Sequence, residues 1–364
     1  MKKIAVFTSN VYEPMSARMQ KGIVDAAYRE GFKAIFFASF SDSYSSKYYK
    51  EYQRYDEGDS VSFDIPDLDD FDGAIRITTY FSPNAEKHLD QILMNANIPV
   101  VNIAGSKEQY RNIGCDEHAS FAEILKHIVE HHGCRDIYHV AGLQDKDFTH
   151  ERIKTYKDVL EKHGIQYDSK KIFYGNLWRD CGEPALEYIL EHCRRRGKTL
   201  PDAIVCANDY TAVGVINACK TRGINVPKDL IVTGYDGVNE GLYGYPTLTT
   251  SRQPHYNMGY QAVVTLRKMI DGENVDSDIR IKGDFRLGQS FGCVSNEREN
   301  IDDIREILTT LLDHSTSIAQ STTNLMISVS DADTLEECFQ AINRNAKTDT
   351  GFKEMLLCLA HGWD

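Results

Sequence analysis

The sequence of 364 residues lacks any apolar run long enough to cross a bilayer, which would require about 20 consecutive apolar residues. The first apolar run, residues 4–7, ends in polar residues, and the start MKKIAVFTSN does not have the pattern of a secretory signal. We therefore expect a cytoplasmic protein without a membrane partner.

Positive charge is also scarce, because 41 Lys and Arg residues stand against 54 Asp and Glu residues, for a formal net charge of -13. Proteins that bind nucleic acid usually present a basic patch to the phosphates. The main basic run, residues 194–198, follows a helical segment, where cations complement the helix C-terminus. We expect no direct nucleic-acid contact by this segment.

The sequence has nine cysteines but no CxxC pair and no compact Cys/His cluster. This usage is typical of a reducing cytoplasm and argues against a disulfide framework and a structural zinc site. His131, His132 and His150 show no second ligand at metal spacing. We predict that the chain holds no metal and no cofactor.

Motifs of common catalytic sites are missing as well. The sequence contains no GxGxxG after the first strand and no GxxxxGK[ST], GxSxG or HExxH. The acidic residues of segment 67–72 lack the glycine and the terminal glutamate of a calcium loop. We predict a protein that is not an enzyme and has no catalytic residues.

What the sequence does contain is a regular alternation of short apolar runs and amphipathic stretches. Predicted strands are 4–7, 33–38, 73–77, 99–103, 137–140, 203–206 and 230–232, and predicted helices are 16–29, 84–95, 117–132, 150–163, 183–196, 210–222 and 256–271. Such alternation is typical of parallel sheets with helices on both faces. We expect a doubly wound α/β protein with enough strands for two sheets.

The pattern changes from about residue 298. Apolar residues at 301, 304, 308, 311, 312 and 318 predict one long helix with an apolar stripe, over 298–328, which could form a coiled coil. A helix over 331–342 and a strand over 352–359 would follow. These last residues are too few to close a core, so 329–364 is expected to open a further, truncated domain.

Polar side chains gather where the predicted strands end, in segments 8–13, 78–80, 102–104, 142–152, 206–210 and 234–237. The carboxyl ends of parallel strands are where open α/β sheets bind ligands. Carboxylate, amide and arginine groups beside aromatic rings suit a polyhydroxylated ligand. For single residues a structural role stays open: Asn208 and Asp209 could cap a helix, Arg152 could face solvent, and Tyr235 could be core.

Segment 203–237 closely resembles the ligand-binding domain of lactose/galactose-repressor-type proteins, in its AND-xx-A-x-G helix start, its VP-x-D bend and its GYDG strand end. Further matches are Lys21-Gly22-Ile23, Phe71-Asp72-Gly73, Pro99-Val100-Val101, Arg152, the stretch 248–254, Met258-Gly259 and Ala262. The resemblance covers about 1–296. It implies the type I periplasmic-binding-protein fold: two doubly wound parallel-sheet lobes joined by three crossovers, with a ligand between them. The N-terminal lobe would comprise 1–132 and 252–278, and the C-terminal lobe 133–251 and 279–297.

The resemblance also implies roles for individual residues. Asp236 would accept bonds from ligand hydroxyls, Arg152 would clamp ligand oxygens, and Asp209 would start a helix facing the ligand. Tyr12 and Gln253 match family positions in the first loop and at the hinge, Phe148 falls in the ligand-facing loop, and Trp178 lies beside an aromatic position. With the strand-end residues, the predicted ligand-binding set is Asn10, Tyr12, Tyr80, Phe148, Arg152, Trp178, Asn208, Asp209, Asp236 and Gln253.

Two departures from the repressors shape the functional expectation. Only three residues stand before the first predicted strand, so we expect no helix-turn-helix unit ahead of it. The segment RLGQSFGC at 286–293 resembles the end of the sensor in a subgroup where it precedes a helical linker and a diguanylate cyclase or AraC-type output domain. We therefore expect a homodimeric sensor of a sugar-like molecule that signals through its C-terminal helix. Two alternatives stay open: an NAD-type oxidoreductase on a doubly wound sheet, and a ligand-free protein-interaction scaffold.

Overall fold

The computed structural model describes residues 2–11, 13–39, 60–79, 81–293, 309, 323–324 and 326–349. The chain divides into two compact units, Met1–Ser295 and Asn296–Asp364. The expected linker helix lies almost wholly outside the described residues, and the expected strand over 352–359 lies outside them. In the second unit, helix α12 (Leu335–Asp349) confirms the helix predicted after residue 331.

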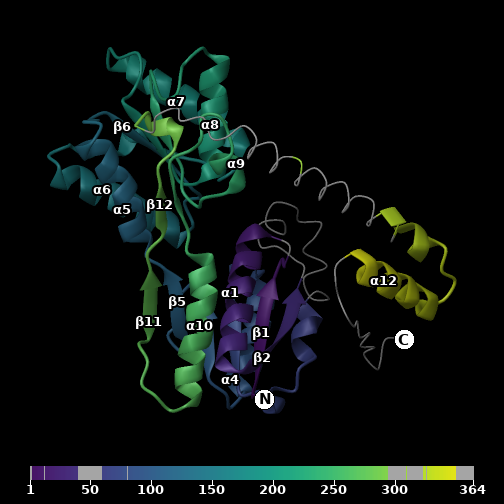
Figure 1. Ribbon diagram of the computed structural model, residues 1–364. Helices are drawn as coiled ribbons and strands as arrows, with labels where there is room; N and C mark the ends of the chain where they lie inside the picture. Colours follow the sequence, from purple (N-terminus) through teal and green to yellow (C-terminus); the bar gives the residue numbers. More distant parts are fainter. Residues whose placement is uncertain are drawn as a thin grey trace. The chain divides into compact units, whose positions relative to one another are not determined.

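The first lobe of the N-terminal unit is built on a six-stranded parallel sheet with the order β11-β5-β4-β3-β1-β2. Its strands are β1 (Lys2–Ser9), β2 (Phe32–Ser39), β3 (Gly73–Ile77), β4 (Val100–Ile103), β5 (Arg111–Cys115) and β11 (Asp278–Ile281). Helices α1 (Pro14–Glu30) and α10 (His255–Ile270) pack side by side on one face, and α4 (Pro83–Asn95) covers the other (Figure 1). The near-continuous apolar strands are therefore buried on both faces.

The second lobe has a four-stranded parallel sheet with the order β7-β6-β8-β9. Its strands are β6 (Ile137–Ala141), β7 (Ile172–Tyr174), β8 (Ala203–Cys206) and β9 (Ile231–Thr233), and its helices are α5 (Glu117–Glu130), α6 (Asp147–Lys162), α7 (Gly182–Arg195), α8 (Asp209–Thr221) and α9 (Asn239–Leu242). One apolar core joins α5 and α6 to the sheet and another joins α7 and α8 to its opposite face (Figure 1). Alternate residues of each strand enter opposite cores.

Three passages of the chain connect the lobes. They lie between β5 and α5, between β10 (Thr250–Arg252) and α10, and between β11 and β12 (Asp284–Arg286). β10 and β12 pair antiparallel, and isolated bridges at Thr233–Thr249 and Asp236–Arg252 join this pair to the end of β9. The predicted α/β fold of two parallel-sheet lobes is confirmed.

The first passage comes earlier than the boundary expected at residue 132. Phe121, Leu125 and Ile128 of α5 share a core with Val205 and Ile231 of the second sheet. Helix α5 thus belongs to the second lobe, because its apolar side chains are buried there. The third passage lies after Ile281 rather than after residue 278, because β11 pairs with β5 as far as Ile281–Cys115.

Several helices begin directly after a strand, so that their N-termini lie at the carboxyl edge of a sheet. The Glu13 carboxylate caps α1 by accepting bonds from the amides of Met15 and Ser16, and Asn208 caps α8 in the same way from Thr211. The positive ends of these helices therefore face the region where the strand-end loops lie.

Candidate functional site

Left-handed backbone conformations cluster at the ends of the parallel strands. Among the described residues, four that are not glycine have a positive φ: Asn10 (50°) after β1, Ala104 (61°) after β4, Leu177 (72°) after β7, and Asp236 (107°) after β9. Such conformations are costly for residues with a Cβ and are frequent at functional sites. Asn10 and Asp236 belong to the predicted ligand-binding set, and Leu177 directly precedes Trp178, which also belongs to it.

Asp236 has the most strained of these conformations. Its amide donates to the Ser251 carbonyl at 3.0 Å, and Gln253 Nε2 donates to its Oδ1 at 2.6 Å. Burial raises the pKa of the Asp236 carboxyl to about 7, against the opposing effects of the Arg152 charge and the Gln253 bond. The carboxyl group is thus held in one place and keeps acceptor capacity beyond the bond from Gln253.

The structure requires glycine on each side of Tyr235 and Asp236, for a different reason at Gly234 and at Gly237. A Cβ on Gly234 would lie 2.1 Å from Asp209 Oδ1, so that close packing excludes any side chain there. Gly237 has a φ of +70°, and a Cβ on it would lie 2.7 Å from the Arg252 Cβ. The GYDG sequence therefore fits a turn that is pressed between the start of α8 and β10.

Arg152 of α6 is buried beside this turn. Its Nε and one terminal nitrogen donate to Glu117 Oε2 at 3.0 and 2.9 Å, and the other terminal nitrogen donates to the Ala207 carbonyl. The guanidinium also lies 4.1 Å from the centre of the Tyr235 ring. Although burial opposes the charge, the nearby Glu117 carboxylate raises the pKa of Arg152 above its ordinary range, so this cation is fixed.

The structure brings Phe148, Arg152, Asp236 and Gln253 together. The Arg152 guanidinium lies 5.2 Å from the Phe148 ring centre, and the charges of Arg152 and Asp236 each influence the pKa of the other. A fixed cation, a carboxyl group and an aromatic face thus lie within one neighbourhood. Such a group can orient a hydroxylated ligand through charge-assisted bonds.

The first lobe also contributes charge to this region. Glu13, at the start of α1, raises the pKa of Asp236 through its charge, and it influences Tyr210 in the same way. Asn10 lies near Glu13, and its amide donates to the Ser39 carbonyl at 3.1 Å. The predicted residues Tyr12 and Tyr80 lie outside the described residues.

Asn208 and Asp209 are engaged by the protein itself. Asn208 Oδ1 caps α8, and its Nδ2 donates to the Leu177 carbonyl at 2.8 Å. Asp209 is fully buried, and its two oxygens accept bonds from Thr250 Oγ1 at 2.7 Å and the Val238 amide at 2.8 Å. Capping, which the sequence left open for this pair, is present at Asn208, and direct ligand contact by either residue stays a prediction.

Trp178 lies against Tyr210, the second residue of α8. Its side chain is 48% exposed, and its ring centre lies 5.5 Å from that of Tyr210. The Arg179 guanidinium in turn lies 5.5 Å from the Tyr210 ring centre. The exposed Trp178 ring, packed against the half-buried Tyr210, can accept a flat apolar face, such as one side of a sugar ring.

Two residues of the site are not in the predicted ligand-binding set. Glu117 holds Arg152, and Glu13, which lies in the strand-end segment 8–13, brings charge from the first lobe. Glu117 follows β5, whose sequence RNIGC has no apolar run and was not predicted as a strand. Recognising that strand would have placed Glu117 at the same edge as the other candidates.

The fold brings together a group of Cys and His side chains, although the cysteine lies far from the histidines in the sequence. His127, His132 and Cys293 each place a ligand atom within 4.8 Å of the others. Burial lowers the pKa of both histidines. Spacing along the chain could not show this group, because Cys293 is 161 residues from its nearest member in the sequence and reaches it only through the fold.

Among the described residues, no helix is both long and apolar enough to span a membrane.

Residues 126–291 match the family model described as a periplasmic binding protein-like domain. The catabolite control protein A of Priestia megaterium is 32% identical over 197 residues, which are 53% of this chain and 57% of that protein. This chain thus spans little more than half the length of that relative.

Solved structures of regulators share the fold. The transcriptional regulator CelR in complex with cellobiose matches with a TM-score of 0.61 at 22% identity, covering 80% of this chain and 84% of that one. The lac repressor dimer bound to operator matches with a TM-score of 0.60 at 18% identity, covering 79% and 93%. These two proteins are named as a transcriptional regulator and a repressor. The chain therefore shares the two-lobed type I fold of these regulators, and residues 126–291 are similar to the periplasmic binding protein-like domain.

Proposed function

We propose that the N-terminal unit is a sensor that binds a sugar-like molecule between its two lobes and reports occupancy to a transcription-regulatory output. The observation that carries this proposal is the grouping of the fixed Arg152 cation, the Asp236 carboxyl group and the Phe148 ring at the ends of the second-lobe strands. Glu13 of the first lobe influences the same carboxyl group. A ligand that contacts both lobes would favour one relative arrangement of them.

The relatives support the ligand class. CelR was solved with cellobiose, a sugar. Charged groups that bind hydroxyls contribute roughly 1.5–3 kcal/mol each, so removing one such bond weakens binding about 10- to 100-fold. We propose a cytoplasmic homodimer, in line with the lac repressor dimer among the similar structures. A diguanylate cyclase or AraC-type output stays a prediction.

The test is a panel of monosaccharides and disaccharides screened by the melting temperature of the chain. We expect at least one sugar to raise the melting temperature, because a ligand that binds only the native state stabilises it. In Asp236→Asn, which retains shape and can still pair with Gln253, the affinity for that sugar should fall about 10- to 100-fold. Arg152→Ala is a poorer test, because it also breaks the pair with Glu117.

A matched control removes the same charge elsewhere on the lobe. Asp158 lies on the exposed face of α6, the helix that carries Arg152, and Asp158→Asn should leave the sugar response unchanged. If both variants respond to the sugar as the wild type does, the assignment of the site to Asp236 fails. If no sugar shifts the melting temperature of the wild type, the ligand class is wrong.

A further inference from the structure

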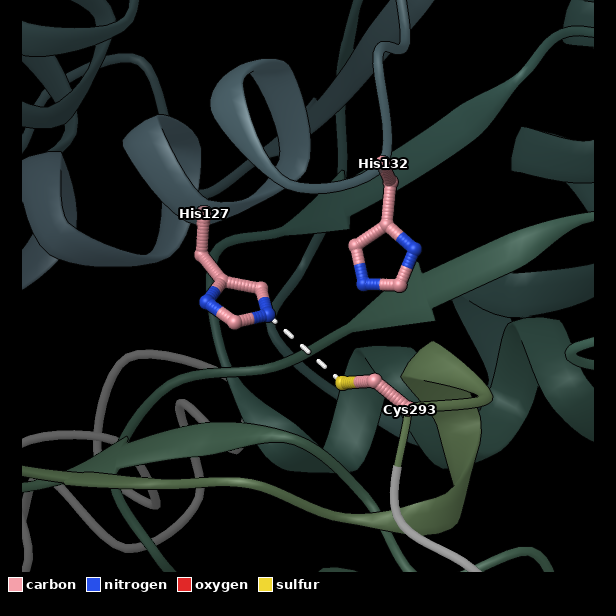
Figure 2. A group of neighbouring side chains, drawn as sticks. All are labelled: His127, His132 and Cys293. Carbon is pink, nitrogen blue, oxygen red and sulfur yellow. Dashed lines mark hydrogen bonds between the residues drawn. The ribbon is translucent and has the colours of Figure 1, made fainter.

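Three soft or borderline ligand groups converge at the end of the N-terminal unit, away from the Arg152 group. His127 lies in the last turn of α5, His132 follows the helix, and Cys293 is the last described residue before the chain continues to the C-terminal unit (Figure 2). All three ligand atoms lie within 4.8 Å of one another. Two imidazoles and one thiolate form a donor set that suits Zn²⁺.

The distances fit such an ion. His127 Nε2 and Cys293 Sγ are 3.6 Å apart. In a tetrahedral site with ordinary zinc–nitrogen and zinc–sulfur bond lengths, a nitrogen and a sulfur ligand are separated by about 3.6 Å. The ligand atom of His132 lies within 4.8 Å of both other ligand atoms, so small side-chain rotations would bring it within bonding distance of the same ion.

One ligand residue has a buried polar atom without a protein partner. His132 Nε2 is buried, and it has no hydrogen-bond partner among the described residues. A buried polar atom of this kind normally finds a partner, and an ion or a water is the usual explanation when the protein provides none. In Figure 2 the ring of His132 lies across from the His127 and Cys293 side chains.

Aromatic packing holds the two imidazoles in place. The ring of buried Phe291 stacks on His127, with centroids 5.0 Å apart, and meets His132 edge-on at 5.2 Å. Gly292 then turns the chain with a φ of +77°, and Cys293 follows directly. The segment before it is anchored, because the Gln289 and Ser290 amides donate to Thr247. The ligand groups are thus positioned by the fold before any ion binds.

We propose that His127, His132 and Cys293 bind one divalent cation of the zinc class and that the ion ties the residue at the exit of the N-terminal unit to α5. Three protein ligands leave the fourth position to water or another ligand. The C-terminal unit begins at Asn296, only a few residues beyond Cys293. The ion would therefore bind a few residues before the start of the C-terminal unit.

The experiment titrates the full chain with Co²⁺ in the presence of a non-thiol reductant. Tetrahedral cobalt with a thiolate ligand has visible d–d bands and a sulfur-to-metal charge-transfer band in the near ultraviolet. We expect both to saturate at one equivalent of Co²⁺ and to disappear when one equivalent of Zn²⁺ is added. Cys293→Ser should abolish the charge-transfer band, and His132→Gln should weaken binding at least tenfold.

Neighbouring residues provide matched controls. His131→Gln removes an exposed imidazole next to His132, and Cys338→Ser removes a thiol of the C-terminal unit; both should retain full binding. Zn²⁺ should raise the melting temperature of the wild type and leave that of Cys293→Ser unchanged. Because Cys293 is exposed, its substitution should not impair folding.

The proposal is overturned if the wild type shows no charge-transfer band at one equivalent, or if Cys293→Ser retains it. Loss of binding in His131→Gln with retention in His132→Gln would overturn the assigned ligand set. None of these outcomes depends on whether a sugar binds to the Arg152 group.

Discussion

Asp209 and Asp236 stand at the carboxyl ends of adjacent strands, β8 and β9, and both are carboxylates next to an aromatic residue. Asp209 is fully buried, and each of its oxygens accepts a bond from the protein. Asp236 has a strained backbone, and Gln253 donates to one of its oxygens at 2.6 Å. The same residue type at the same sheet edge can thus serve the fold at one strand and remain available for a ligand at the next.

The difference follows from what surrounds each group. Asp209 begins α8 and lies against Gly234, Thr250 and Val238, so it connects β8, β9 and β10. Asp236 lies one residue beyond the buried Tyr235, on the side of the turn that meets Arg152 and Gln253. Predictions that separate stability from binding can test this contrast.

The largest effect is expected at Asp209. Asp209→Ala leaves the buried Thr250 hydroxyl and the Val238 amide without their acceptor, and each unsatisfied donor costs about 1–3 kcal/mol. We expect the free energy of unfolding to fall by about 3 kcal/mol, measured by urea denaturation. The sugar response of the remaining folded protein should persist. Loss of that response in a folded Asp209→Ala protein would show that Asp209 also contributes to ligand binding, contrary to the contrast with Asp236.

The sequence predicted much of the architecture, because buried parallel strands and amphipathic helices have strong apolar patterns. All seven predicted strands and all seven predicted helices of the N-terminal unit appear, within a few residues of their expected ends. Strands β5, β7, β10, β11 and β12 were missed, since they are short, lie at edges or hinges, or carry polar residues such as those of RNIGC. Pairing with distant strands, rather than local pattern, makes these segments strands.

The site was less accessible to the same reasoning. Strand ends pointed to Arg152 and Asp236, and the structure places them near each other. The sequence anticipated a helix cap at Asn208 or Asp209. It could not show that Glu117 holds Arg152, that Asn208 donates to Leu177 or that Thr250 donates to Asp209, because these contacts join residues far apart in the chain. For the same reason it missed the approach of Cys293 to His127 and His132.

An intermediate effect is expected from the ionisation of Asp236. Burial raises its pKa from 3.8 to about 7, so between these values the native chain keeps a proton that the unfolded chain has lost. The free energy of unfolding of the wild type should therefore fall as pH rises from about 4 to about 7. Asp236→Asn cannot titrate, so its stability relative to the wild type should rise over this window, by at least about 1 kcal/mol.

Urea denaturation of both proteins at several pH values from about 5 to about 8 measures this difference. Asp158→Asn, whose carboxylate is exposed, serves as the control and should follow the wild type. A difference between wild type and Asp236→Asn that stays constant over this range would mean that the carboxyl group titrates normally, and the contrast with an exposed aspartate would then disappear.

The smallest effect on stability is expected at Trp178, which is 48% exposed and lies against Tyr210 with ring centres 5.5 Å apart. Trp178→Ala should change the free energy of unfolding by less than about 0.5 kcal/mol, as is usual for surface positions. If the ring covers one face of the bound sugar, the same substitution should weaken binding by about tenfold. Tyr245→Ala, which removes an aromatic ring that is 87% exposed, is the matched control and should leave the affinity unchanged.

Fluorescence gives a second measurement at Trp178. Because the sequence has two tryptophans, Trp363→Phe leaves Trp178 as the single indole fluorophore. A sugar that raises the melting temperature of this variant without changing its fluorescence would place Trp178 outside the binding site.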